Sequence, residues 1–108
     1  MVESTLRLDS IFGSLADATR RDILKRVARK ELSVGEVAAP YRLSLAAVSK
    51  HLQVLEKAKL IIKRRRGKQQ VVLLAPAGIK DAATVMKQYE AMWQQRFDNL
   101  EDFLRKNP

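Results

Sequence analysis

The segment Ser44–Gly67, which reads SLAAVSKHLQVLEKAKLIIKRRRG, restricts the fold more than any other part of this chain. Ser44 is a typical N-cap residue, and apolar residues follow it at the spacing of one helical face, namely Val48, Leu52 and Leu55. A short apolar run rich in β-branched residues comes next, and it ends in three arginines beside a glycine. The segment therefore predicts a capped helix that leads directly into a strand.

Apolar runs on both sides of the arginines predict an antiparallel hairpin. The helix is expected to end near Lys59, and the runs Leu60–Ile62 and Val71–Leu74 then flank a turn that contains Gly67. An isolated two-stranded hairpin is only marginally stable, so this one must pack on the helices. Between Lys59 and Lys68 lie six basic residues and no acidic one, so the tip repels itself unless a polyanion is close.

Three shorter helices are predicted ahead of this segment. Apolar residues at helical spacing indicate the first over Thr5–Leu15. Asp17 resembles an N-cap for a second helix over Ala18–Lys30, and Ser33 begins a capping box that opens a third. Pro40 ends the third helix, because proline cannot donate the next backbone hydrogen bond. The side chains expected to face the core are Ile23, Leu24, Val27 and Ala28 in the second helix and Val37 and Ala38 in the third.

One long helix is predicted from Pro76 almost to Asn107, since proline suits the first helical turn. Its apolar residues from Val85 to Leu104 recur in steps of mostly three and four, and they include the only tryptophan of the chain. Part of this stripe belongs to the core, but it is longer than a body of about 75 residues can cover. We therefore predict a dimer interface of the first and last helices, made by Leu8, Ile11, Phe12, Tyr89, Trp93, Phe97, Leu100 and Leu104.

The net positive charge of the chain lies entirely in its first 75 residues. The net charge is +9, and residues 76–108 contain five basic and five acidic side chains, which cancel. A basic body joined to a neutral helix favours polyanion binding by the body and a different role for the helix. A basic surface that serves only solubility is the competing interpretation.

Length and composition limit the class of protein. A chain of 108 residues predicts a single domain, 1–108, with dimerisation helices at its two ends. Its lack of cysteine excludes disulfides, thiolate metal sites and cysteine nucleophiles. No apolar run approaches the ~20 residues that span a bilayer, and the N-terminus lacks a signal-peptide core, so we expect a cytoplasmic protein without a membrane partner. An enzyme is disfavoured, because no histidine base is matched with a serine or carboxylate and no phosphate-binding glycine loop is present.

The face of the Ser44 helix opposite its apolar stripe is small, polar and basic. Such a face suits the major groove of DNA, which is ~12 Å wide and accepts a helix without bulky apolar side chains. His51 lies on the flank of the stripe, where a lone histidine is more often packed or in contact with phosphate than a metal ligand. The predicted DNA-binding residues are Ser44, Ala46, Ser49, Lys50, His51, Gln53 and Lys57 on the helix and Arg64, Arg65, Arg66 and Lys68 on the hairpin.

Two segments resemble the ArsR-type family of bacterial regulators. Residues 15–24 read LADATRRDIL, which is similar to the family pattern L-(A/S)-D-(P/A)-T-R-R-x-I-L. Residues 43–60 read LSLAAVSKHLQVLEKAKL, which is similar to S-x-x-x-V-S-(K/H)-H-L-x-x-L-x-x-A-G-L, with Lys59 in place of the usual glycine. The resemblance implies a winged helix-turn-helix fold, mainly α, with about five helices and a two-stranded wing. It also implies a homodimeric repressor that binds double-stranded DNA.

The family's metal sensors use a cysteine pair or Asp/His pairs that this chain does not reproduce. Asp98, Glu101 and Asp102 lie at i, i+3 and i+4 on the last helix, where three carboxylates would favour hard cations only weakly. We favour a solvated acidic face there. The ending from Trp93 to Leu104 is similar to a metal-independent branch of the family. No metal and no cofactor are therefore predicted, and a small-molecule effector would be one of unknown identity.

The sequence thus predicts a DNA-binding transcriptional regulator that acts as a homodimer on an inverted-repeat operator. The competing function is a winged-helix module that binds RNA or another protein without operator specificity. A preference for single strands, or equal affinity for every duplex, would favour that alternative.

Overall fold

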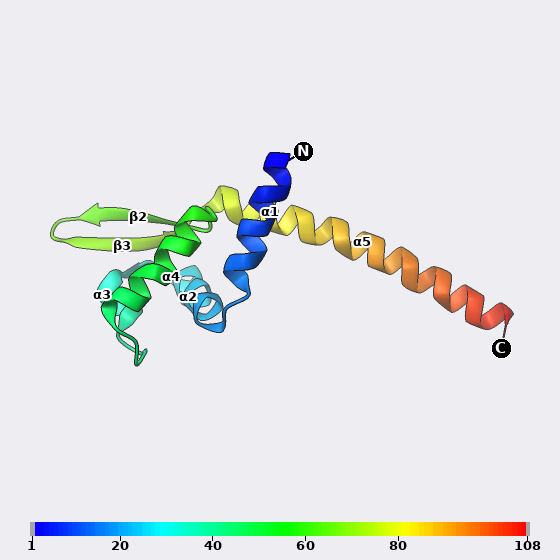
Figure 1. Ribbon diagram of the computed structural model, residues 1–108, viewed down its shortest axis with the longest axis horizontal. Coiled ribbons are helices and arrows are strands. Elements are labelled where there is room, and N and C mark those ends of the chain that lie inside the picture. The colour runs from blue at the N-terminus through cyan, green and yellow to red at the C-terminus, as the bar shows by residue number, and fades with distance from the viewer. Residues whose placement is uncertain (1, 108) are drawn as a thin grey trace.

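The computed structural model describes residues 2–107, with side chains from residue 8 onward, and shows a helical body from which one helix projects (Figure 1). The sheet order is β1-β3-β2, with both pairs antiparallel. Helix α5 and the β2–β3 hairpin extend from opposite sides of the body, and the molecule is 66 Å long. The elements are α1 (Val2–Leu15), α2 (Ala18–Arg29), β1 (Leu32–Ser33), α3 (Val34–Ala38), α4 (Leu45–Lys57), β2 (Ile61–Arg66), β3 (Gln69–Leu74) and α5 (Pro76–Lys106).

The mainly helical architecture with five helices and a basic hairpin is as predicted, but the sheet has three strands instead of two. The additional strand β1 pairs with β3, placing Leu32 opposite Val72 and Ser33 opposite Val71. Two residues are too few to show the period-two alternation from which a strand is recognised in a sequence. This third strand fixes the base of the hairpin to the segment between α2 and α3.

The core forms where the apolar stripes of α1, α2, α3 and α4 meet the inner face of the sheet. The predicted centre of the α4 stripe is fully buried, as are Ile23 of α2 and Val37 of α3. The prediction for Ala28 is wrong, because this residue is exposed. It lies about 140° from Ile23 around the helix, at ~100° per residue, and so leaves the buried face.

Side-chain caps begin three of the helices at the predicted residues. Asp17 Oδ1 accepts from the backbone N–H of Arg20 at 3.0 Å, and this bond holds the pKa of the carboxyl below its ordinary value. In the capping box, Ser33 Oγ accepts from the N–H of Glu36 at 3.1 Å, while Glu36 accepts from the N–H of Ser33 at 3.0 Å. The bonds from Ser33 likewise lower the pKa of Glu36.

These two caps predict acid-sensitive stability. A carboxyl whose pKa is lower in the folded than in the unfolded chain stabilises the fold above its unfolded pKa, and this contribution is lost as the pH falls through the folded pKa. We therefore expect the urea midpoint to decline as the pH falls below about 4. The double variant Asp17→Asn with Glu36→Gln should show a smaller decline, measured by circular dichroism. An equal pH dependence in both proteins would contradict the role of the caps.

Helix α4 ends in a Schellman motif whose left-handed residue is Lys59, with φ of 59°. The N–H of Leu60 donates to the carbonyl of Leu55 at 3.0 Å, and the N–H of Lys59 donates to that of Glu56 at 3.0 Å. Leu55 and Leu60 are both buried, as the motif requires. The helix therefore ends in the geometry that normally favours glycine, although a lysine stands there.

Replacing Lys59 with glycine is expected to stabilise the protein by about 0.5–1 kcal/mol, since the left-handed conformation carries a steric cost for any residue with a Cβ. Chemical denaturation would measure the change. Lys57→Gly, within the last turn of α4, is the matched control and should destabilise by about 1 kcal/mol. A loss of stability in Lys59→Gly would show that the lysine side chain contributes more than its backbone conformation costs.

Helix α5 begins in direct contact with this turn. The N–H of Ala75 donates to the carbonyl of Leu60 at 2.9 Å, and Pro76 occupies the first helical turn. Gly78 is buried, and a Cβ added to it would lie 1.7 Å from the carbonyl oxygen of Lys59. Only a glycine allows the two backbones to approach this closely, so α5 and the end of α4 form one rigid joint.

Candidate nucleic-acid interface

Helix α4 presents the predicted polar face to solvent. Ala46, Lys50, Gln53 and Lys57 are exposed, and Ser49 is half-buried. The exposed Ser44 has its Oγ committed to the helix, because it accepts from the N–H of Ala47 at 3.1 Å. Ser44 therefore serves α4 as its cap.

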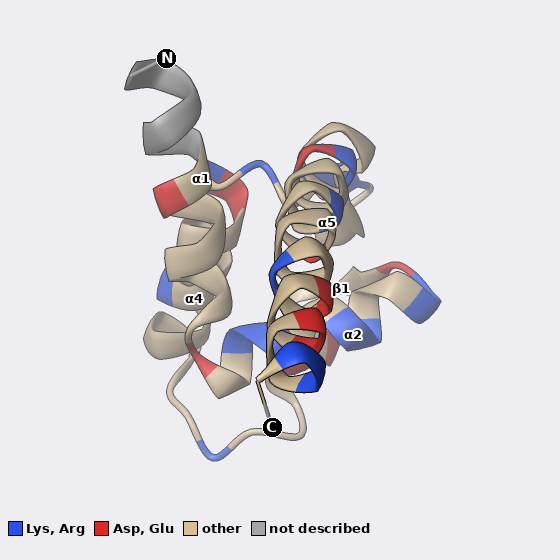
Figure 2. Cartoon of the chain, turned by 90° about the vertical axis from the view of Figure 1, so that its right-hand side faces the viewer, with Lys and Arg blue, Asp and Glu red and all other residues tan. Residues whose placement is uncertain are grey.

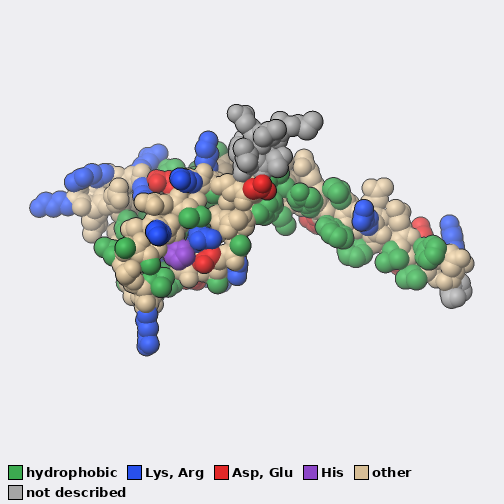
Figure 3. Space-filling view, viewed as in Figure 1, with side chains coloured by type: hydrophobic (Ala, Val, Ile, Leu, Met, Phe, Trp, Pro, Cys, Tyr) green, Lys and Arg blue, Asp and Glu red, His purple; other side chains and the backbone are tan. Residues whose placement is uncertain are grey.

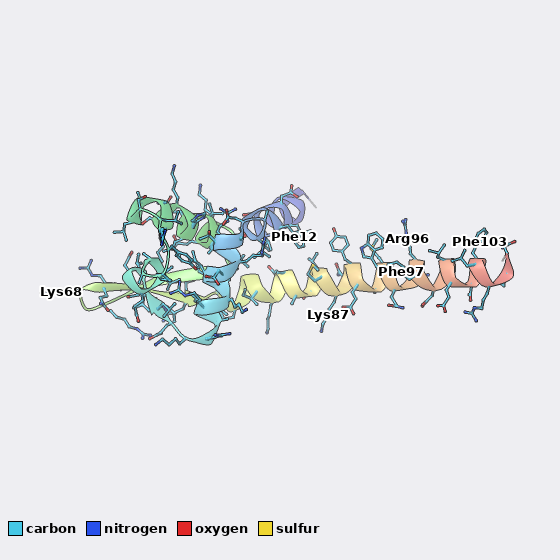
Figure 4. The ribbon with its side chains drawn as sticks, turned by 90° about the horizontal axis from the view of Figure 1, so that it is seen from below. Phe12, Lys68, Lys87, Arg96, Phe97 and Phe103 are labelled. Atoms are coloured by element: carbon cyan, nitrogen blue, oxygen red, sulfur yellow. The ribbon has the colours of Figure 1, made fainter. Side chains whose placement is uncertain are left out.

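The hairpin tip carries exposed positive charge. Arg64, Arg65 and Lys68 are exposed, and none of them forms an ion pair with another residue that the structure describes. Lysine and arginine side chains project from this tip in the space-filling view, and Lys68 marks its end (Figures 3 and 4). Arg66 differs, because it pairs with Glu31, the residue directly before β1. The tip thus offers unpaired cations, while Arg66 is engaged within the chain.

Contacts of Lys63 and Arg26 fix the hairpin and the turn before α4. Lys63 Nζ on β2 lies 3.7 Å from Glu56 Oε1 on α4, which connects the hairpin to the helix. Arg26 of α2 donates to the carbonyl oxygens of Glu36 and Val37 at 2.8 and 2.9 Å, and its guanidinium lies 5.4 Å from the centre of the Tyr41 ring. Arg26 therefore caps the C-terminal end of α3 and holds the turn that leads to α4.

The Tyr41 side chain attaches the same turn to a second residue of α2. Its hydroxyl donates to Asp22 Oδ2 of α2, and partial burial together with this neighbouring carboxylate raises the pKa of the phenol. The phenol therefore remains a neutral hydrogen-bond donor at neutral pH. The turn between α3 and α4 is thus attached to α2 at two places.

His51 is half-buried on the flank of α4 and contacts α2. Its Nδ1 lies 3.3 Å from an N–H group of Arg20 and 4.0 Å from Asp17 Oδ1, the latter beyond hydrogen-bond distance. Arginine can only donate, so Nδ1 of the neutral ring is the acceptor and the ring proton lies on Nε2. The contact with Arg20 agrees with the interpretation of His51 as a packed residue. It leaves the Nε2–H group of the ring as a second polar group that can donate a hydrogen bond.

Arg20 also reaches the end of α1. Its Nε donates to the carbonyl of Ser14 at 2.7 Å, and a terminal nitrogen donates to that of Gly13 at 3.2 Å. One side chain therefore joins the C-terminal end of α1 to a residue of α4. Sequence reasoning missed this link, because its members are 31 positions apart in the chain and only the fold brings them together.

The predicted dimer residues divide into two groups. On α5 the predicted residues are between 43% and 59% exposed, and Figure 4 shows Phe103 on the side of the helix opposite Lys87. Leu8 and Phe12 of α1 are half-buried. Ile11 departs from the prediction: it is 3% exposed and packs in the chain's own core, so it contributes no surface.

The remainder of α5 carries mixed charge. Acidic and basic side chains are interspersed along it (Figure 2). Asp98 accepts a hydrogen bond from Gln94, and Asp102 pairs with Arg105 at 3.1 Å. Within residues 8–107 no three His, Cys, Asp or Glu side chains converge on a site for a metal ion. Within the part of the chain that the structure describes, no helix is long and apolar enough to cross a membrane.

Sequence reasoning also missed Leu45, the first residue of α4. The cap and the apolar spacing in the sequence place Leu45 in the helix but predict no function for its side chain. Leu45 continues the apolar stripe of α4, about 20° from Leu52 and 60° from Val48 at ~100° per residue, so its spacing predicts burial. The structure leaves Leu45 63% exposed.

Helix α4 has a polar exposed face, the turn before it is fixed to α2, and a cationic hairpin follows it. This arrangement defines a winged helix-turn-helix module. A helix-turn-helix domain model matches residues 15–64. The HTH-type transcriptional regulator Rv2034 of Mycobacterium tuberculosis is 40% identical over 81 residues, 75% of this chain and 76% of the relative. The chain belongs to the ArsR-type family of winged helix-turn-helix transcriptional regulators.

Other relatives and solved structures agree with this family. The transcriptional repressor SdpR of Bacillus subtilis is 30% identical over 60 residues, 56% of this chain and 67% of SdpR. An ArsR-like regulator from Rhodococcus sp. RHA1 has a TM-score of 0.76 at 25% identity and covers 94% of this chain and 95% of its own. The homodimeric winged helix-turn-helix DNA-binding domain of Mb0332 from Mycobacterium bovis has a TM-score of 0.64 at 26% identity, with 78% and 79% covered.

Proposed function

We propose that the protein is a sequence-specific repressor that binds an inverted-repeat operator in double-stranded DNA as a homodimer. The observation that carries this proposal is the rigid pairing of the exposed polar face of α4 with the unpaired cations of the hairpin tip. The Lys63–Glu56 ion pair and the Schellman motif hold the two in one unit. A helix and a wing fixed in this way can meet a groove and its flanking backbone together.

The two parts have different tasks. Ala46, Ser49, Lys50 and Gln53 of α4 approach base edges in the major groove, where a glutamine or lysine discriminates between bases by its hydrogen bonds. Arg64, Arg65 and Lys68 of the tip contact phosphate or an adjacent minor groove, which adds affinity without reading sequence. His51 donates its Nε2–H to a phosphate at the edge of the groove.

The symmetry of the proposed operator follows from α5. Its apolar residues from Tyr89 to Leu104 are exposed on a helix that projects from the body, a surface that a second copy of the chain would cover. Two-fold symmetry then places two α4 helices on half-sites about one turn apart, ~34–36 Å, or a multiple of that distance. The homodimeric domain of Mb0332 supports the dimer, and the repressor SdpR supports repression.

Selection from a random duplex pool tests the proposal. We expect the enriched duplexes to share an inverted repeat, and their affinity to fall steeply with salt as counterions are released. Protein titrated against duplex and single-stranded versions of the enriched site distinguishes the competing function. Equal affinity for all duplexes, or a preference for single strands, would favour the RNA- or protein-binding alternative.

The double variant Arg64→Gln with Arg65→Gln is expected to weaken binding to operator and random duplexes by a similar factor. The slope of log affinity against log salt should become shallower by about 0.9 for each phosphate that the variant no longer neutralises. Fluorescence anisotropy across a salt series measures both quantities. Arg105→Gln with Lys106→Gln removes the same charge from the end of α5 and is the matched control. If both double variants behave alike, the wing acts only through net charge.

A further inference from the structure

The first residue of α4 combines an apolar side chain with an unusual degree of exposure. Leu45 is 63% exposed, more than any other large apolar residue among those described. A single exposed leucine is common on protein surfaces and by itself indicates nothing. Here, however, its neighbours Leu43 and Ala46 are exposed too, so a small apolar cluster surrounds the start of the recognition helix.

The position of Leu45 is fixed by the cap. Ser44 adopts an extended conformation and its Oγ binds the N–H of Ala47, which determines where the first turn of α4 begins. Leu45 lies about 20° from Leu52 and about 40° from Ser49 around the helix, so it extends the apolar stripe to the N-terminal end of α4, beside the polar face. Although it continues the stripe, its side chain is left exposed at this end of the helix.

Dimerisation through α5 would not cover this cluster. The joint between α4 and α5 lies at the opposite end of α4, at Lys59 and Gly78. Leu45 is separated from that end by the length of the helix, about 18 Å at ~1.5 Å per residue. The exposed surface of Leu45 therefore remains available to the ligand that α4 itself meets.

The geometry points to thymine recognition: we propose that the Leu45 side chain packs against the C5-methyl group of a thymine in each half-site. This inference rests on the proposed function. The N-terminal residues of a recognition helix are those that contact base edges in the major groove. Among the four bases, thymine alone presents an apolar group at that edge, and a leucine side chain can make no hydrogen bond to the other three.

Replacing single thymines of the selected operator with deoxyuridine tests the inference, because this change removes only the methyl group. At one thymine of each half-site, the wild-type protein should lose about fourfold in affinity, the effect expected for burial of one such group. Leu45→Ala should bind the thymine and deoxyuridine operators equally. Val54→Ala, which shortens another exposed apolar residue of α4, should keep the wild-type preference.

The outcomes separate the inference from the proposed function. Unchanged thermal unfolding and unchanged affinity of Leu45→Ala for random duplex show that the variant is folded and its phosphate contacts are intact. If the wild-type protein selects an operator but tolerates deoxyuridine at every position, thymine recognition is overturned and the proposed function stands. A preference that persists in Leu45→Ala also overturns it. If no operator is selected at all, the proposed function fails and the inference with it.

Discussion

Replacing Gly78 with alanine is expected to destabilise the protein by about 3 kcal/mol, a large effect for one methyl group. The added Cβ would lie 1.7 Å from the carbonyl oxygen and 2.5 Å from the carbonyl carbon of Lys59. Both are backbone atoms, so no side chain can rotate away to make room. Either α5 or the end of α4 must shift, and the hydrogen bond between Ala75 and Leu60 is the first interaction at risk.

Gly13→Ala is the matched control for this prediction. A Cβ at Gly13 would meet no atom of the described residues within 4 Å, and the position lies within α1. Alanine there should stabilise the protein by about 0.5–1 kcal/mol, since glycine is the poorer helix former. Urea denaturation of the two variants measures effects of opposite sign. Similar effects at both positions would contradict the close packing at Gly78.

Replacing Trp93 with alanine is expected to weaken the proposed dimer by about 30-fold or more, the effect typical of a central aromatic residue in an interface. Trp93 is 56% exposed in the single chain, and its ring centre lies 6.1 Å from that of Phe97. These two rings are adjacent on the exposed apolar surface of α5. Sedimentation equilibrium at several protein concentrations measures the change in the dimer dissociation constant.

Gln95→Ala is the control on the same helix, about 200° from Trp93 around its axis. This variant should dimerise like the wild-type protein, because it leaves the apolar stripe intact. Loss of dimer should also reduce affinity for a full operator while a single half-site is bound as before. An intact dimer in Trp93→Ala would contradict the assignment of α5 to the interface.

The parts of the fold that local interactions determine were predictable. Cap residues bond to groups three positions away, so Asp17, Ser33 and Ser44 could be recognised from their neighbours in the sequence. The buried centre of the α4 stripe was predictable as well, because helical periodicity of apolar residues indicates a buried face. The wing followed from two apolar runs around a cluster of arginines, a pattern that is also local.

The parts that remained hidden depend on contacts between distant segments. β1 is recognisable only through its pairing with β3, and the packing of Gly78 depends on the path of the backbone at Lys59. The pairing of Arg66 with Glu31 likewise joins residues 35 positions apart, and it separates one arginine of the tip from the two beside it. Charge and spacing in the sequence identified the candidate interface. Only the fold shows which of its cations form no ion pair among the described residues.

The joint at Lys59 and Gly78 has a consequence for how operators are distinguished. It leaves no hinge between the helix proposed to dimerise and the helix proposed to read DNA, so the angle between two α5 helices sets the distance between two α4 helices. Inserting one base pair between half-sites moves them apart by ~3.4 Å and rotates them by ~35°. A protein in which this joint is rigid cannot adjust the positions of its two α4 helices to such a change. The spacing between half-sites would then be as much a part of its target as the bases themselves.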